Sequence, residues 1–180
     1  MARLVGGQPR HRSRDLAPYK KATGGPSLTS DDLVEECLCF GWIDGLIKTY
    51  DEDSNVQRIT PRRQKSNLSE LNRQRVWKLQ RLGHMTAAGL PALGDQAGDP
   101  SDPFLIPEWV DQRLRVDPAV WKTFNSFPLM YRRLRVAWVV DPKGNRQEER
   151  ERRLAHLIDM TAKGRRYGTE PLRGITYEVE

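Results

Sequence analysis

The chain has 180 residues and a formal net charge of +6; 37% of its residues are hydrophobic and 30% are charged. This length fits one sizeable domain, or a small domain with a helical extension. No apolar run reaches the roughly 20 residues needed to span a bilayer, and no apolar segment follows the basic N-terminus, so we expect neither a transmembrane segment nor a secretory signal. The positive charge makes anionic molecules the candidate partners, unless it is only a solvated surface.

Residues 1–18 are rich in Arg, Gly and Pro, which predicts a disordered arm. A helix is expected to follow, because Thr29 or Ser30 can cap it and acidic residues occupy its first turn, where the helix dipole favours negative charge. Gly41 is expected to end this helix. Apolar residues at helical spacing predict one buried face, formed by Leu33, Val34, Cys37 and Leu38.

The next segment predicts an antiparallel hairpin. Residues 42–50 are rich in β-branched and aromatic side chains, and residues 51–55 are polar and form a turn. Residues 56–60 alternate like a returning strand, which Pro61 ends. A strongly basic loop over residues 61–68 then leads to the next helix.

Helices dominate the remainder. One is expected from a cap at Ser69 to Gly83, and a short one from near Thr86 to Leu93. Residues 98–107 form a Gly-, Asp- and Pro-rich connector, the best candidate for a boundary. Four helices are expected beyond it: one over residues 108–115, one capped by Asp117 with Pro118 in its first turn, one opened by Ser126 and Pro128, and one over residues 146–163.

We therefore predict an α+β fold. Residues 19–97 would form a small antiparallel sheet or hairpin packed with helices, and residues 108–166 a helical region followed by a tail over residues 167–180.

The basic loop and its flanks form the candidate site. A loop that ends at a helix N-terminus can offer backbone N–H groups and a positive dipole end to an anion, and Arg side chains add bidentate recognition of carboxylate or phosphate. Alternatively, the arginines only pair with nearby acidic residues. The candidate ligand-binding residues are Trp42, Asp44, Arg58, Thr60, Arg62, Arg63, Lys65, Ser66, Ser69 and Asn72.

The cysteines and histidines predict no further chemistry. Cys37 and Cys39 would point about 200° apart on a helix, so we expect no disulfide between them and a reducing compartment. Cys39 lies near a helix C-terminus, whose dipole disfavours a thiolate, and we expect it to be a small buried residue. The three histidines lie far apart in the sequence, so neither a metal nor another cofactor is predicted.

The run from Glu35 to Asp44, followed by Thr60-Pro61-Arg62-Arg63 with Ser66, Ser69 and Asn72, resembles the bacterial YdeI/OmpD-associated family. Residues 20–28 resemble the segment before this core, and residues 84–90 the segment after it. The resemblance is strongest over residues 19–93 and looser in the helical half, where Tyr131-Arg132-Arg133 and the Arg-rich last helix fit. It implies a cytoplasmic α+β protein linked to bacteriocin protection, with no established catalytic residue.

The sequence departs from this family in two places. Leu68 stands where members usually carry Trp between the two serines of the loop. Members also usually have an apolar strand before the Lys20-Lys21 segment, whereas residues 1–18 carry no such pattern. We therefore expect the hairpin to lack an edge strand and to present an unpaired edge.

Three functions follow from these residues. The first is a non-catalytic stress- or bacteriocin-protection protein whose basic loop binds an anionic small molecule or an acidic protein. The second is an enzyme with Asp44 as acid/base and Arg58, Arg62 and Arg63 holding an anionic substrate. The third is nonspecific nucleic-acid binding by a basic face that joins the loop to Arg73, Arg75 and Lys78. The absence of a catalytic motif favours the first.

Overall fold

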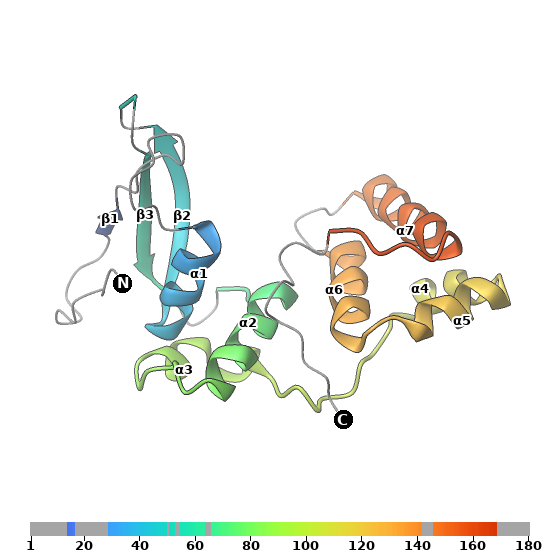
Figure 1. The fold of residues 1–180 in the computed structure, drawn as a ribbon, viewed down its shortest axis with the longest axis horizontal. Helices are drawn as coiled ribbons and strands as arrows, with labels where there is room; N and C mark the ends of the chain where they lie inside the picture. The colour runs from blue at the N-terminus through green and yellow to red at the C-terminus, as the bar shows by residue number, and fades with distance from the viewer. Residues whose placement is uncertain are drawn as a thin grey trace. The chain divides into compact units, whose positions relative to one another are not determined.

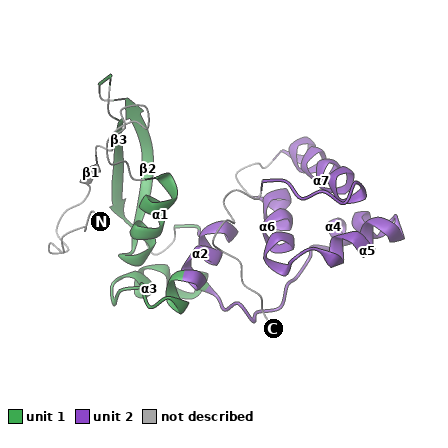
Figure 2. Cartoon of the chain, viewed as in Figure 1, with its two compact units in different colours: residues 1–67, 79–97 green, residues 68–78, 98–180 purple. Residues whose placement is uncertain are grey.

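A computed structural model describes residues 14–16, 29–49, 51–52, 55–63, 66–141 and 146–168 of the chain. The chain divides into two compact units (Figure 2). Unit 1 comprises residues 1–67 and 79–97, and unit 2 comprises residues 68–78 and 98–180. The strands belong to unit 1 and most helices to unit 2, which confirms the predicted α+β class (Figure 1).

Unit 1 contains an antiparallel sheet in the order β1-β3-β2. β2 (Trp42–Thr49) and β3 (Asn55–Pro61) form the predicted hairpin, with Trp42 opposite Pro61 and an irregularity between Asp44 and Ile47. The expectation of a missing edge strand is wrong: β1 (Arg14–Leu16) pairs antiparallel with β3, so β3 is central. The strand could not be recognised in the sequence because three residues are too few to show a period-2 pattern. It forms because pairing with β3 provides hydrogen-bond partners for its backbone.

Helix α1 (Ser30–Cys39) packs on this sheet. Thr29 caps it: the Thr29 hydroxyl accepts from the Asp32 backbone N–H at 3.1 Å, and the Asp32 carboxylate accepts from the Thr29 backbone N–H at 3.1 Å. The buried side of α1 contacts the sheet through Leu33 and Cys37, which cluster with Ile59. The helix ends before Gly41, whose φ of 72° is accessible to glycine at little cost.

Helix α2 (Glu70–Arg81) begins at its predicted cap, because the Ser69 hydroxyl accepts from the Asn72 backbone N–H at 3.3 Å. Regular helix in α3 (Gly89–Leu93) starts later than expected, and η2 (Gly94–Ala97) follows it. Thr86, where the helix was expected to start, instead makes side-chain hydrogen bonds at this position. Its hydroxyl donates to the Cys39 carbonyl at 2.6 Å and accepts from the Gly89 backbone N–H at 3.2 Å, which ties α3 to the end of α1.

Unit 2 contains α4 (Glu108–Arg115), α5 (Pro118–Ser126), α6 (Leu129–Val140) and α7 (Gln147–Ala162). Asp117 caps α5 as predicted, accepting from the Ala119 backbone N–H at 2.8 Å. Ser126 is not a cap: it ends α5 and its hydroxyl donates to the Thr123 carbonyl at 2.7 Å, while Pro128 occupies the cap position of α6.

One hydrophobic core holds the α4–α7 region together, with α7 packed on α5 and α6. Its buried residues are Val110, Leu114, Val120, Phe124, Val136, Val139, Leu154 and Leu157. No helix among the described residues has the length and apolar character required to cross a membrane.

Candidate functional site

Arg62, at the start of the basic loop, is turned into the protein. Only 9% of it is exposed, and its Nη2 donates to the Asn67 carbonyl at 2.8 Å and to the Ser66 carbonyl at 3.5 Å. Its backbone N–H donates to the Gly41 carbonyl at 2.9 Å. Burial lowers the pKa of Arg62, and the nearby Asp44 carboxylate opposes that shift. Arg62 therefore closes the loop on itself and fixes its start next to the end of α1.

Arg63 has the opposite environment. It is exposed, and its carbonyl accepts from the Ser66 backbone N–H at 2.9 Å. Ser66 is half-buried. Lys65, also predicted for the site, lies outside the described residues.

The candidate site residues on the strands lie on opposite faces of the sheet. Asp44 lies opposite Ile59, so both side chains are on the face that α1 covers, and the Gln57 amide donates to Asp44 Oδ2 at 3.5 Å. Arg58 and Thr60 alternate with Ile59 and lie on the other face. The structure therefore brings Asp44 near Arg62 but places it apart from Arg58.

The remaining candidates are built into helices and a core. Ser69 caps α2, and the Asn72 side-chain carbonyl accepts from Arg75 Nη1 at 2.9 Å; both residues belong to unit 2. Trp42 is half-buried and packs against the Leu33–Cys37–Ile59 cluster of unit 1.

Both cysteines have the properties of core residues. Burial, reinforced by Asp44 and Glu36, raises the pKa of Cys37 to about 12. Burial, reinforced by Glu36 and Glu35, raises the pKa of Cys39 to about 11. Cys39 is 4% exposed, which confirms the prediction of a buried residue instead of a nucleophile. Among the residues that the structure describes, no group of three or more His, Cys, Asp or Glu side chains could hold a metal ion.

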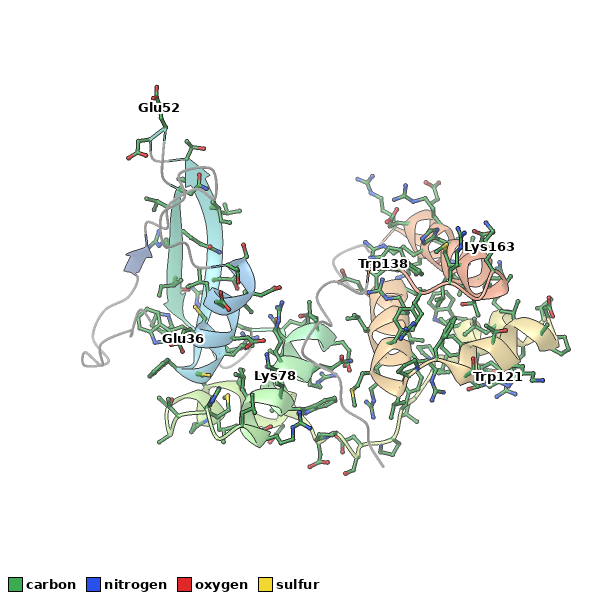
Figure 3. The ribbon with its side chains drawn as sticks, viewed as in Figure 1. Glu36, Glu52, Lys78, Trp121, Trp138 and Lys163 are labelled. Carbon is green, nitrogen blue, oxygen red and sulfur yellow. The ribbon has the colours of Figure 1, made fainter. Side chains whose placement is uncertain are left out.

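A second set of arginines, in unit 2, was missed from the sequence. Arg135 on α6 is 8% exposed, and its guanidinium carbon lies 4.8 Å from the ring centroid of Tyr167 and 5.8 Å from that of Trp138, which Figure 3 labels on α6. Burial raises the pKa of Tyr167 to about 12, although the Arg135 cation opposes the shift. The available signal was that α6 contains three arginines and no acidic residue, in a helix that is mostly buried.

Two family models match the chain. One, a domain of unknown function (DUF8412), covers residues 8–92. The other, described as bacteriocin-protection, YdeI or OmpD-associated, covers residues 103–164. The predicted YdeI/OmpD resemblance is confirmed. No similar protein was found among the curated proteins, and none among the solved structures.

The position of the YdeI/OmpD match differs from the expectation in one respect. It covers α4–α7 of unit 2, whereas residues 19–93, where the resemblance was expected to be strongest, fall in the region matched by the other model. The YdeI/OmpD match supports a role of the bacteriocin-protection type. It does not extend to the basic loop, so the loop has to be judged from its own geometry.

Proposed function

We propose that this is a non-catalytic, cytoplasmic protein of the bacteriocin-protection type, and that its loop of residues 62–67 binds an anionic group on a small molecule or an acidic protein. The YdeI/OmpD match over residues 103–164 supports the type of function. The loop's internal hydrogen bonds, made by Arg62, support the binding role.

These hydrogen bonds support the proposal because they distinguish two adjacent arginines: Arg62 binds within the protein, and Arg63 does not share these bonds. Arg62 Nη2 donates to the carbonyls of Ser66 and Asn67, which ties the start of the loop to its described end. Arg63 stays exposed on that closed loop. A cation presented by a preorganised loop binds an anion with less loss of conformational entropy than one on a flexible chain.

The two other functions lack a comparable observation. The enzyme interpretation needs Asp44 and Arg58 together, and they lie on opposite faces of the sheet. The nucleic-acid interpretation needs Arg73 and Arg75 on a basic surface. Arg73 instead pairs with Glu70 at 2.6 Å, and Arg75 is only 5% exposed.

The binding role is tested by a thermal-shift titration with citrate and with a hexaglutamate peptide, at low and moderate salt. We expect the ligand to raise the melting temperature saturably. Arg63→Gln should raise the Kd about tenfold, because it removes one charge-assisted hydrogen bond. Arg165→Gln, which removes one exposed charge at the end of unit 2, is the matched control and should bind like the wild type. Equal affinity in Arg63→Gln and the wild type would refute the loop site.

The type of function needs a separate test in cells. A bacterial host that expresses the protein should survive bacteriocin exposure at a higher rate than a host with an empty vector. If binding by the loop serves protection, Arg63→Gln should lose much of the gain while Arg165→Gln retains it. Survival equal to the empty vector would contradict the protective role even if the loop binds anions.

A further inference from the structure

Two consecutive arginines of α6 lie against one aromatic ring in unit 2. The guanidinium carbons of Arg132 and Arg133 are 5.8 Å and 5.7 Å from the ring centroid of Phe104. Arg133 also lies 5.6 Å from the ring centroid of Trp77 and is only 9% exposed. Arg132 is half-buried. Two cations, one buried and one half-buried, thus lie against the ring of Phe104.

Neither arginine has a carboxylate partner among the described residues. Arg132 Nη1 donates to the side-chain oxygen of Asn125 at 3.1 Å, and Arg133 Nη2 donates to the backbone carbonyl of Asp102. The Asp102 carboxylate itself is engaged elsewhere, accepting from the Asp99 backbone N–H at 2.7 Å. The buried Nε of each arginine has no hydrogen-bond partner, and burial alone lowers the pKa of Arg132.

Several other arginines of unit 2 have a carboxylate partner. Arg73 pairs with Glu70 at 2.6 Å, Arg113 with Glu151 at 3.0 Å and Arg153 with Glu149 at 2.9 Å. The arginine side chains of these pairs are 33%, 50% and 16% exposed, and each has a carboxylate partner. The buried Arg133, 9% exposed, and the half-buried Arg132 have none in the described chain, although the cost of an unpaired charge rises with burial.

Cation–π contacts offset only part of that cost. The attraction of a cation for a ring face is smaller than the effective penalty for removing an ion from water. Each guanidinium also keeps one terminal nitrogen, Nη2 of Arg132 and Nη1 of Arg133, that makes no hydrogen bond to a described residue. An oxyanion at this place would supply both the missing charge and the missing acceptors.

We propose that Arg132 and Arg133, held against Phe104, bind a phosphate group. Two guanidiniums match the double negative charge of a phosphate, and the planar donor fork of arginine matches the geometry of its oxygens. The phosphate can be free or an ester of a small molecule. This site lies in the segment matched by the YdeI/OmpD model and is independent of the loop of residues 62–67.

The test is isothermal titration of the full chain with inorganic phosphate and, separately, with glycerol 3-phosphate, at fixed ionic strength and with chloride as the reference anion. We expect saturable binding that Arg132→Gln and Arg133→Gln each weaken about tenfold or more. Arg113→Gln removes an exposed, paired cation and should leave the affinity unchanged, as should Arg63→Gln. Tighter binding of glycerol 3-phosphate than of phosphate would identify an ester as the ligand, and the reverse would identify the free ion.

A second measurement separates a binding role from a structural one. In phosphate-free buffer, Arg132→Met should keep or raise the melting temperature, because it removes a cation without a counter-charge and keeps a long apolar side chain. A fall in melting temperature together with unchanged phosphate affinity would assign Arg132 to structure and overturn the proposal. Absence of saturable binding would also overturn it. If Arg133→Gln does not fold, the phosphate affinity of Arg132→Gln tests the proposal, because Arg132 is only half-buried.

Discussion

Single residues of the same type have different roles in this protein, and burial determines which. Arg62 and Arg63 are neighbours, yet the first closes the loop through the Asn67 carbonyl and the second is exposed. Arg133 is buried between the rings of Trp77 and Phe104, and the half-buried Arg132 contacts Phe104 as well. Cys37 and Cys39, 1% and 4% exposed, behave as small apolar residues. These environments suggest a pH dependence that can be measured at the level of one side chain.

Stability should decline above pH 9 because of Cys37. Burial raises the pKa of this thiol from 9.0 to about 12 in the folded protein. Well below pH 9 the thiol is protonated in both states and contributes no pH dependence. Above it the unfolded chain loses the proton while the folded chain keeps it, so the free energy of unfolding falls as pH rises towards 12. From about pH 8 to 10 this single group should remove about 1 kcal/mol.

Urea denaturation of wild type and Cys37→Ala at these two pH values measures the effect. The variant is less stable throughout because it loses buried volume, but its stability should decline less with pH. Cys39, Tyr131 and Tyr167, whose pKa values are also raised by burial, act in the same direction but are present in both proteins and cancel in the comparison. An equal decline in the two proteins would contradict the assignment.

The residues of the candidate site could be located in the sequence, but their orientation could not. Arg62 and Arg63 lie at the end of the same strand and carry the same charge. They differ because Arg62 donates to the carbonyls of Gly41 and Asn67, and these contacts form only in the folded protein. The arginines of α6 had a visible signal, three cations without an acid in one buried helix, but charge in a sequence is ordinarily interpreted as exposure.

At the scale of elements, local signals predicted most helix starts and ends. Thr29, Ser69 and Asp117 cap their helices as expected, because a cap depends on residues three or fewer positions away. β1 was missed because its existence depends on pairing with β3, which is distant in sequence. The late start of α3 was missed because Thr86 bonds to Cys39 instead of starting a regular helix.

Two glycines that end helices provide a comparison at this scale. Gly41 and Gly83 have nearly the same φ, 72° and 69°, so replacement by Ala should cost each about 1 kcal/mol of backbone strain. A Cβ on Gly83 would meet no atom within 4 Å, whereas one on Gly41 would lie 2.5 Å from Ala92 Cβ and 2.9 Å from the Ala88 carbonyl oxygen. Gly41→Ala should therefore lose about 1–3 kcal/mol more than Gly83→Ala. Urea denaturation measures both, and equal losses would mean that α3 does not pack this closely on Gly41.

At the scale of the whole molecule, each unit has a hydrophobic cluster of its own among the residues that the structure describes. The Leu33–Cys37–Ile59 cluster lies in unit 1, and the cluster around Val110, Phe124 and Leu157 lies in unit 2. The two clusters share no residue, and the two family models divide the chain in a similar place, between residues 92 and 103. The inclusion of residues 68–78 in unit 2 had no signal in the sequence, since it depends on contacts such as the Gln74 amide donating to the Met130 carbonyl at 3.0 Å.

Two cores predict two separable unfolding events. Phe124 is fully buried in unit 2, and Phe124→Ala should cost about 3–5 kcal/mol there. Fluorine-labelled tryptophan resolves the outcome by NMR, because Trp42 is in unit 1 whereas Trp77, Trp109, Trp121 and Trp138 are in unit 2. In a urea series, Phe124→Ala should lower the midpoint for the four tryptophans of unit 2 and leave that of Trp42 unchanged, and Leu33→Ala should do the reverse. If either substitution shifts all five midpoints together, the chain unfolds as one cooperative unit and ligand binding at one site stabilises both cores.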